Sequence, residues 1–126
     1  MTLLRSYEDL DAWQADHELT LAVYRASDSF PRRELFGIVA QVRRSAVSVP
    51  ANLAEGFGRR SPKELLRFCR VADGSLQETK YLLRLAADLG YYDADGYDAL
   101  RKRADRVGAL LGGLSRHLNE SIRTNQ

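Results

Sequence analysis

The sequence predicts an all-α protein, an up-down-up-down antiparallel four-helix bundle. Apolar residues recur at spacings of three and four over long stretches, and no stretch alternates apolar and polar residues as a half-buried strand does. Proline and glycine interrupt this spacing at only three places, near residues 30–32, 56–62 and 89–93. Because helices joined by short connections lie antiparallel, we expect one domain over residues 1–126 with helices at about 8–29, 32–57, 62–89 and 94–120.

Length and composition narrow the class of protein. A chain of 126 residues supports one hydrophobic core and is too short for two sizeable ones. No apolar run approaches the roughly 18–20 residues that cross a bilayer, and the N-terminal residues lack the basic and apolar segments of a secretory signal. The single cysteine, Cys69, excludes an internal disulfide framework and fits a reducing compartment. We therefore expect a cytoplasmic protein without a membrane partner.

The first predicted helix, residues 8–29, has two apolar stripes on nearly opposite faces. Ser6 and Asp9 have the spacing of a capping box at its start. A surface helix of a monomer normally has one apolar stripe, so two stripes predict burial on two sides and self-association. We expect His17 to pack or hydrogen-bond within the second stripe rather than bind a metal. The first stripe is Ala12, Ala15, Leu19, Ala22, Val23, Ala26 and Phe30, and the second is Leu10, Trp13, His17, Leu21 and Tyr24.

The second predicted helix, residues 32–57, contains a proline. Pro50 has no N–H, so the carbonyl of Ala46 loses its helical partner and we expect a kink. The core seam is accompanied by a weaker second seam of small and apolar residues. The core seam is Leu35, Ile38, Val39, Val42, Ala46, Val49 and Leu53, and the second seam is Phe36, Ala40, Val47 and Ala54.

A straight line of polar side chains runs beside that core seam. Its members are spaced by four, three, four and three, and Glu34 extends the line backward. We favour a structural ladder of hydrogen bonds to another helix or subunit, since buried polar networks fix register. The alternative is a strip that binds a ligand or RNA. Some of these side chains, or a water, would bond the freed carbonyl of Ala46. The line is Gln41, Ser45, Ser48, Asn52 and Glu55.

The third predicted helix has the clearest start signal in the chain. Ser61, Pro62 and Glu64 have the pattern of an N-cap, a first-turn proline and a capping box, and Gly90 is the expected stop. Gly74 lies inside this helix, where glycine implies close packing or a function. We expect Glu78 to pair with Arg43 or Arg44, in one subunit or between two.

The fourth predicted helix, residues 94–120, has an unbroken heptad seam, which is typical of a bundle helix. Three glycines, Gly108, Gly112 and Gly113, weaken it and are expected where another backbone comes close. We expect residues 121–126 to be frayed. The seam is Tyr97, Leu100, Ala104, Val107, Leu111, Leu114 and Leu118.

The residues do not predict an enzyme. His17 and His117 lie on different helices, and neither follows a carboxylate by three residues as in di-iron bundles. Cys69 falls on the core face with no nearby histidine in sequence to activate it. No glycine-rich phosphate loop follows a strand. We therefore expect no catalytic residue, no metal and no cofactor.

Charge alternates in sign along the chain. Residues 1–31 and 71–98 each carry two bases and six acids, whereas residues 32–70 carry nine bases and three acids. Residues 99–126 carry six bases and two acids, and most bases are arginine. We interpret this alternation as electrostatic attraction between neighbouring antiparallel helices of opposite charge. A basic surface for nucleic acid is the alternative.

Nucleic acid would be contacted by the basic residues of the second and fourth helices and of the second connection. The groups near that connection and near the start of the fourth helix should lie at opposite ends of the bundle. We therefore expect two rims and weak, sequence-tolerant binding. The candidate contacts are Arg43, Arg44, Arg59, Arg60, Lys63, Arg101, Lys102 and Arg103.

A long motif in the second helix is specific enough to indicate a family. The string Ser48-Val49-Pro50-Ala51-Asn52-Leu53-Ala54-Glu55-Gly56 follows Gln41-x-Arg43-Arg44-Ser45-x-Val47, and Phe30-Pro31-x-x-Glu34 precedes it. Residues 60–64, 74–78 and 89–91 continue the match. Over roughly residues 7–118, the chain resembles the four-helix bundle family named after the 23S rRNA intervening sequence protein.

The resemblance implies a bacterial protein without enzymatic activity. Some members are encoded in insertions within large-subunit ribosomal RNA genes. The family is similar to the accessory variability determinant of diversity-generating retroelements, which forms a homopentamer and binds a reverse transcriptase and nucleic acid. The resemblance therefore implies a homo-oligomer, with five subunits in a ring, and RNA, DNA or a reverse transcriptase as partners. Two functions stay open: a nucleic-acid-binding or ribonucleoprotein accessory module, and a protein-interaction scaffold whose arginines serve subunit contacts.

Overall fold

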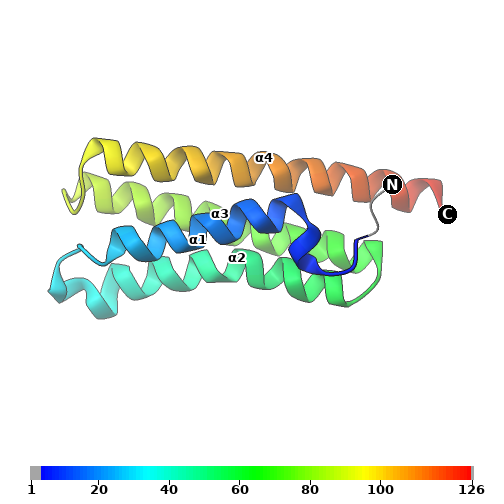
Figure 1. The fold of residues 1–126 in the computed structure, drawn as a ribbon, viewed down its shortest axis with the longest axis horizontal. Coiled ribbons are helices and arrows are strands. Elements are labelled where there is room, and N and C mark those ends of the chain that lie inside the picture. Colours follow the sequence, from blue (N-terminus) through cyan, green and yellow to red (C-terminus); the bar gives the residue numbers. More distant parts are fainter. Residues whose placement is uncertain (1–3, 126) are drawn as a thin grey trace.

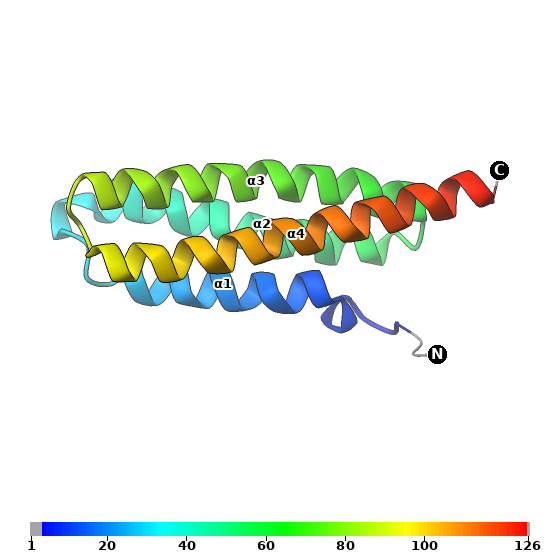
Figure 2. The ribbon, with the colours of Figure 1, turned by 90° about the horizontal axis from the view of Figure 1, so that it is seen from above.

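Four α-helices lie side by side and alternate in direction along the chain in the computed structural model, which describes residues 4–125 (Figure 1). This arrangement confirms the predicted antiparallel bundle. Residues 4 and 125, the ends of the described chain, lie at the end of the bundle that holds the α2–α3 turn, and the last turns of α4 extend beyond that turn (Figure 2). The helices are α1, Asp11–Ser27; α2, Ala40–Gly58; α3, Pro62–Asp88; and α4, Ala94–Thr124.

The core is formed by one seam from each helix, largely as the spacing predicts. Leu19, Val49, Leu76 and Val107 are fully buried and come one from each helix. Burying a leucine or valine side chain contributes about 1.5–3 kcal/mol. These seams, rather than helix propensity, hold the bundle together.

The predicted start of the first helix is wrong. Ser6 and Asp9 form the expected capping box, but it closes a single 3₁₀ turn over Tyr7–Asp9. Leu10 then adopts an extended backbone, with φ −76° and ψ 125°, and α1 begins only at Asp11. The extended residue turns the Leu10 side chain into the protein, where it is 5 % exposed. Burial of Leu10 therefore offsets the break in the helix.

The predicted start of the second helix is also wrong. A 3₁₀ turn over Arg32–Glu34 and a wide π-type turn over Leu35–Val39 precede α2. The Glu34 carboxylate accepts hydrogen bonds from the Ile38 N–H and, at 2.5 Å, from the Tyr91 hydroxyl. A Cβ at Gly37 would lie 2.5 Å from Glu34 Oε1, so any other residue here would displace the Glu34 carboxylate. As a result Phe36 leaves the predicted second seam and is 93 % exposed.

Two other helix ends also depart from expectation. Ser61 accepts the Glu64 N–H as predicted, but the Glu64 carboxylate bonds Arg67 instead of closing the capping box. Helix α4 continues to Thr124 instead of fraying after 120. Ile122 packs against the core one turn beyond Leu118 and so extends the seam.

The glycines of α4 do not mark a close approach of another backbone within the chain. A Cβ at Gly108 would meet only the Leu76 side chain, at 3.5 Å, and Cβ atoms at Gly112 and Gly113 would meet only the Arg116 guanidinium. A Cβ at Gly74 would point into open space. The tight crossing is instead at Gly56, where a Cβ would lie 2.6 Å from the Cβ of Phe68.

No helix within residues 4–125 combines the length and the apolar character needed to cross a membrane.

Candidate interaction sites

A ladder of hydrogen bonds joins α2 to α3 in the middle of the bundle. Thr79 donates to Ser45 Oγ at 2.8 Å, and the hydroxyl oxygens of Ser48 and Ser75 lie 2.9 Å apart. Asn52 Nδ2 donates to the Ser48 carbonyl and hydroxyl oxygens, at 2.7 and 3.0 Å. The three central members of the predicted polar line therefore contact α3 or each other.

The ends of the polar line behave differently. Gln41 and Glu55 are exposed, and Glu55 forms an ion pair with Arg59 at 3.6 Å. Glu78 is exposed on α3, and within residues 4–125 it forms no ion pair with either arginine that we expected as its partner. For Arg43 the reason is that its side chain turns toward α1 instead of α3.

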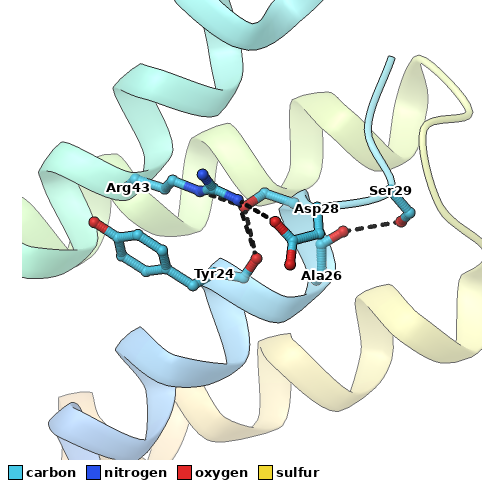
Figure 3. A network of polar contacts seen from close by, with 6 residues as sticks. Tyr24, Ala26, Asp28, Ser29 and Arg43 are labelled. Atoms are coloured by element: carbon cyan, nitrogen blue, oxygen red, sulfur yellow. Dashed lines mark hydrogen bonds and ion pairs between the residues drawn. The ribbon is translucent and has the colours of Figure 1, made fainter. Parts of the chain in front are cut away.

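Arg43 connects α2 to the end of α1 (Figure 3). Its guanidinium donates to Ser27 Oγ at 2.9 Å, to the Tyr24 carbonyl at 3.2 Å and to Asp28 Oδ1 at 2.9 Å. It also lies over the Tyr24 ring, 4.7 Å from its centre. Only 23 % of its side chain is exposed. The hydrogen bonds of Arg43 are therefore used between helices of the single chain, and its contact with nucleic acid stays a prediction.

The carbonyl that Pro50 frees is bonded from α1. Thr20 Oγ1 lies 3.2 Å from the Ala46 carbonyl oxygen and 3.0 Å from the Asp16 carbonyl oxygen. The expectation that the polar line of α2 would supply this bond is wrong, because those side chains turn toward α3. Threonine hydroxyls often bond the carbonyl four residues earlier, and here the same group also faces the neighbouring helix.

Asp16 is buried one turn before Thr20. Its exposed fraction is 0 %, and neither carboxyl oxygen has a hydrogen-bond partner in the structure. Burial raises the pKa of the Asp16 carboxyl to about 8. Asp16 occupies the core face of α1 between Ala12 and Leu19, a position that the spacing of the first stripe could have indicated.

The remaining candidate bases divide into paired and unpaired groups. Arg101 pairs with Asp98 and Asp105, Lys102 with Asp98, and Arg59 with Glu55. Hydrogen bonds from Arg101 and Lys102 hold the pKa of the Asp98 carboxyl below its usual range. Such exposed pairs contribute little stability but reduce the local positive charge. In the described chain, no ion pair forms at Arg44, Arg60, Lys63 or Arg103.

The α2–α3 turn gathers exposed positive charge at one end of the bundle. Arg59, Arg60 and Lys63 are all exposed there, and Arg101–Arg103 lie in the half of α4 nearer the other end (Figure 1). Arg60 has a φ of 54°, in the left-handed region that normally favours glycine. Beside it is a shallow apolar hollow of about 210 Å³, lined by Phe57, Pro62, Leu65 and Leu118 among others.

The second stripe of α1 is partly uncovered on the outer face of the bundle. The Tyr7 ring meets the Trp13 ring edge to face, with centres 5.0 Å apart, and the Trp13 and His17 rings stack with centres 4.9 Å apart. This contact agrees with the expected packing role of His17. Tyr24 and, on neighbouring α2, Val47 are about two-fifths exposed. Leu10 is the exception, because it is buried in the chain itself.

No cluster of three or more histidine, cysteine, aspartate or glutamate residues within residues 4–125 could hold a metal ion. Cys69 is buried, and burial raises the pKa of its thiol to about 11. A thiol that stays protonated is a poor nucleophile.

Comparisons with known proteins agree with this architecture. The model of the family "23S rRNA-intervening sequence protein" matches residues 8–113. A crystal structure from Bacteroides thetaiotaomicron, described as a protein with unknown function from the S23 ribosomal protein family, has a TM-score of 0.74 and 20 % identity. The match covers 82 % of this chain and 97 % of that one. Among curated proteins, none matches the chain.

Proposed function

We propose, since the chain belongs to the 23S rRNA-intervening sequence protein family, that it is a homo-oligomeric, non-enzymatic module that binds nucleic acid through its α2–α3 turn. The family's name refers to ribosomal RNA, which supports RNA as the first ligand to test. The observation that carries the proposal is the group of exposed bases at that turn.

The turn has the chemistry that phosphate groups require. Arg60 and Lys63 are exposed and without an ion pair in the described chain, and Arg59 forms an exposed pair with Glu55 and lies 5.5 Å from the centre of the Phe68 ring. Arginine and lysine side chains bind phosphate oxygens and release the counterions that surround nucleic acid. The aromatic residue nearest in sequence, Phe57, is half-buried, so the turn offers little surface for base stacking. Binding would therefore depend on charge and tolerate many sequences.

Self-association is part of the proposal because a partly apolar face of the bundle has no partner within the chain. On this face the stacked Trp13 and His17 rings of α1 are only half-buried, and Tyr24 is exposed. A ring is built by a heterologous contact, in which this face would meet a different surface of the next subunit. Five subunits are what the resemblance to the retroelement protein implies. A ring would repeat the α2–α3 turn around one rim and increase its avidity.

Removal of the unpaired bases tests the proposal. Binding of a fluorescein-labelled single-stranded RNA is measured by anisotropy at low salt for the wild type and for Arg60→Ala with Lys63→Ala. The matched control is Arg101→Ala with Lys102→Ala, which removes two bases that are already paired with acids. The turn variant should bind about tenfold more weakly or worse, and the control should bind nearly as well as the wild type. Absence of binding by the wild type would overturn the proposal.

A protein-interaction scaffold is the second candidate, and Arg43 favours it. Arg43 forms contacts between α1 and α2. If other arginines formed such contacts between subunits, they would have a role that does not involve nucleic acid. In that case the exposed bases would serve the oligomer, and Arg60→Ala with Lys63→Ala would change the sedimentation of the protein instead of RNA binding.

A further inference from the structure

Asp16 stands apart from every other polar group in the protein. In the described residues, its two carboxyl oxygens are the only buried side-chain oxygen or nitrogen atoms without a hydrogen-bond partner. The side chain is fully buried in α1. An ionised carboxylate in such a place costs several kcal/mol, so the group is neutral when α1 is packed against the bundle.

Within residues 4–125, the surroundings of Asp16 provide no cation that would stabilise its charged form. Thr20 of α1 bonds Ala46 of α2. Because the two helices are antiparallel, the residue one turn before Thr20 lies opposite the residue one turn after Ala46. That places Asp16 at the level of Pro50, which is buried and has no N–H to donate. The nearest cation of α2 toward α1, Arg43, is held at Ser27 and Asp28 near the far end of α1.

The other elements do not supply a partner either. On α4, Arg103 and Arg106 line an outer groove together with Asp11 and Glu18 of α1. The buried titratable group of α3 is Cys69, whose thiol is neutral. On α1 itself, His17 stacks on Trp13 with the two rings nearly parallel, at 7°.

We propose that α1 is a proton-controlled helix: it packs against α2 and α4 with Asp16 protonated, and loss of that proton favours its release from the rest of the bundle. The proposal does not depend on nucleic-acid binding.

The architecture allows α1 to separate from the other three helices. At 17 residues it is the shortest of the four, and extended Leu10 and the connection through Pro31 flank it. The remaining helices keep their own ties, through the Ser45–Thr79 hydrogen bond between α2 and α3 and the Lys80–Asp105 ion pair between α3 and α4. In a released α1, both apolar stripes and the Asp16 carboxyl would face water.

The direction of the pH effect follows from the two states of Asp16. Released, the carboxyl has an ordinary pKa near 4, whereas packed it holds its proton up to about pH 8. Between these values packing takes up one proton, so the equilibrium constant for release rises about tenfold per pH unit. Above about pH 8 Asp16 is ionised in both the packed and the released state, so the equilibrium constant for release no longer changes with pH.

Hydrogen exchange of the full-length protein tests the proposal. Peptides from α1 and α3 are followed by mass spectrometry between about pH 5 and pH 7.5, corrected for the intrinsic exchange rate. The opening constant of the α1 amides should rise about tenfold per pH unit and should exceed that of the α3 amides at every pH, because α1 opens while the other helices stay packed. Asp16→Asn, which is neutral at every pH, should remove the rise. Glu18→Gln, which removes an exposed acid of the same helix, should leave it.

Three results would overturn the proposal. The α1 opening constant of the wild type could be flat over this range. Asp16→Asn could retain the rise, which would assign it to His17 or another group. Peptides of α1 and α3 could instead open with the same constant at every pH, which would show that the whole bundle unfolds at once and that α1 has no separate release. None of these results bears on RNA binding, so the proposed function is tested independently.

Discussion

The hydroxyl of Thr20 on α1 lies 3.2 Å from the carbonyl oxygen of Ala46 on α2 and donates a hydrogen bond to it. That carbonyl lacks a helical partner because Pro50 has no N–H. One threonine therefore satisfies the acceptor that the proline kink leaves open, and it does so from a different helix.

Thr20→Val should destabilise the protein by about 1–3 kcal/mol, because it leaves the Ala46 carbonyl buried and unpaired. Urea unfolding followed by circular dichroism measures the change. Thr20→Ser keeps the hydroxyl and should recover most of the lost stability. In a Pro50→Ala background the Ala46 carbonyl regains an N–H donor, so the cost of Thr20→Val should shrink. An equal cost in both backgrounds would show that the hydroxyl has no such role.

Asp16→Asn should stabilise the protein, increasingly so as the pH rises. The folded wild type keeps a proton on Asp16 up to about pH 8, whereas the unfolded chain loses it near pH 4. The wild type therefore loses stability between these values, by about 1.4 kcal/mol per pH unit, and the asparagine variant does not. The difference in unfolding free energy should grow from about pH 4 to pH 8 and then level off. A difference in unfolding free energy between the two proteins that stays constant with pH would contradict a protonated, buried Asp16.

Within the ladder between α2 and α3, the Thr79–Ser45 hydrogen bond should contribute more to stability than the hydrogen bonds of Asn52. Thr79 is fully buried and donates to Ser45, so Thr79→Val should cost about 1–3 kcal/mol. Asn52 is half-buried and bonds only within its own helix, so Asn52→Leu should cost less. Both costs are read from urea unfolding, with the oligomer size checked by sedimentation. A larger effect of Asn52→Leu on assembly would indicate an intersubunit contact of this side chain.

The left-handed backbone of Arg60 predicts opposite effects on stability and binding. A non-glycine residue in this region costs about 1–2 kcal/mol, and Arg60 has a φ of 54°. Arg60→Gly should therefore raise the melting temperature while weakening RNA binding. Arg59→Gly is the matched change at the neighbouring residue, whose φ of −73° is ordinary, and should not stabilise. An Arg60→Gly variant that is less stable than the wild type would contradict this account.

Sequence patterns predict the faces of single helices better than the contacts between them. The heptad of α4 and the N-cap at Ser61 depend on neighbouring residues in the chain, and the structure contains them. The roles of Thr20, Arg43 and Asp16 depend on which residue of another helix lies opposite. The spacing of residues within one helix does not predict how two helices are aligned along their axes. Leu10 and Gly37 illustrate the same limit, since tertiary burial and the Glu34–Tyr91 contact override helix propensity there.

The salt dependence of RNA binding tests the central claim most directly. Each phosphate contact to a single strand contributes about −0.7 to the slope of log affinity against log salt concentration. The slope of the wild type should therefore be steep, and that of Arg60→Ala with Lys63→Ala should be shallower by about 1.4, the share of two contacts. Arg101→Ala with Lys102→Ala should keep nearly the wild-type slope. A wild-type affinity that is independent of salt, or equal slopes for the wild type and the turn variant, would contradict the assignment of the α2–α3 turn as the nucleic-acid contact.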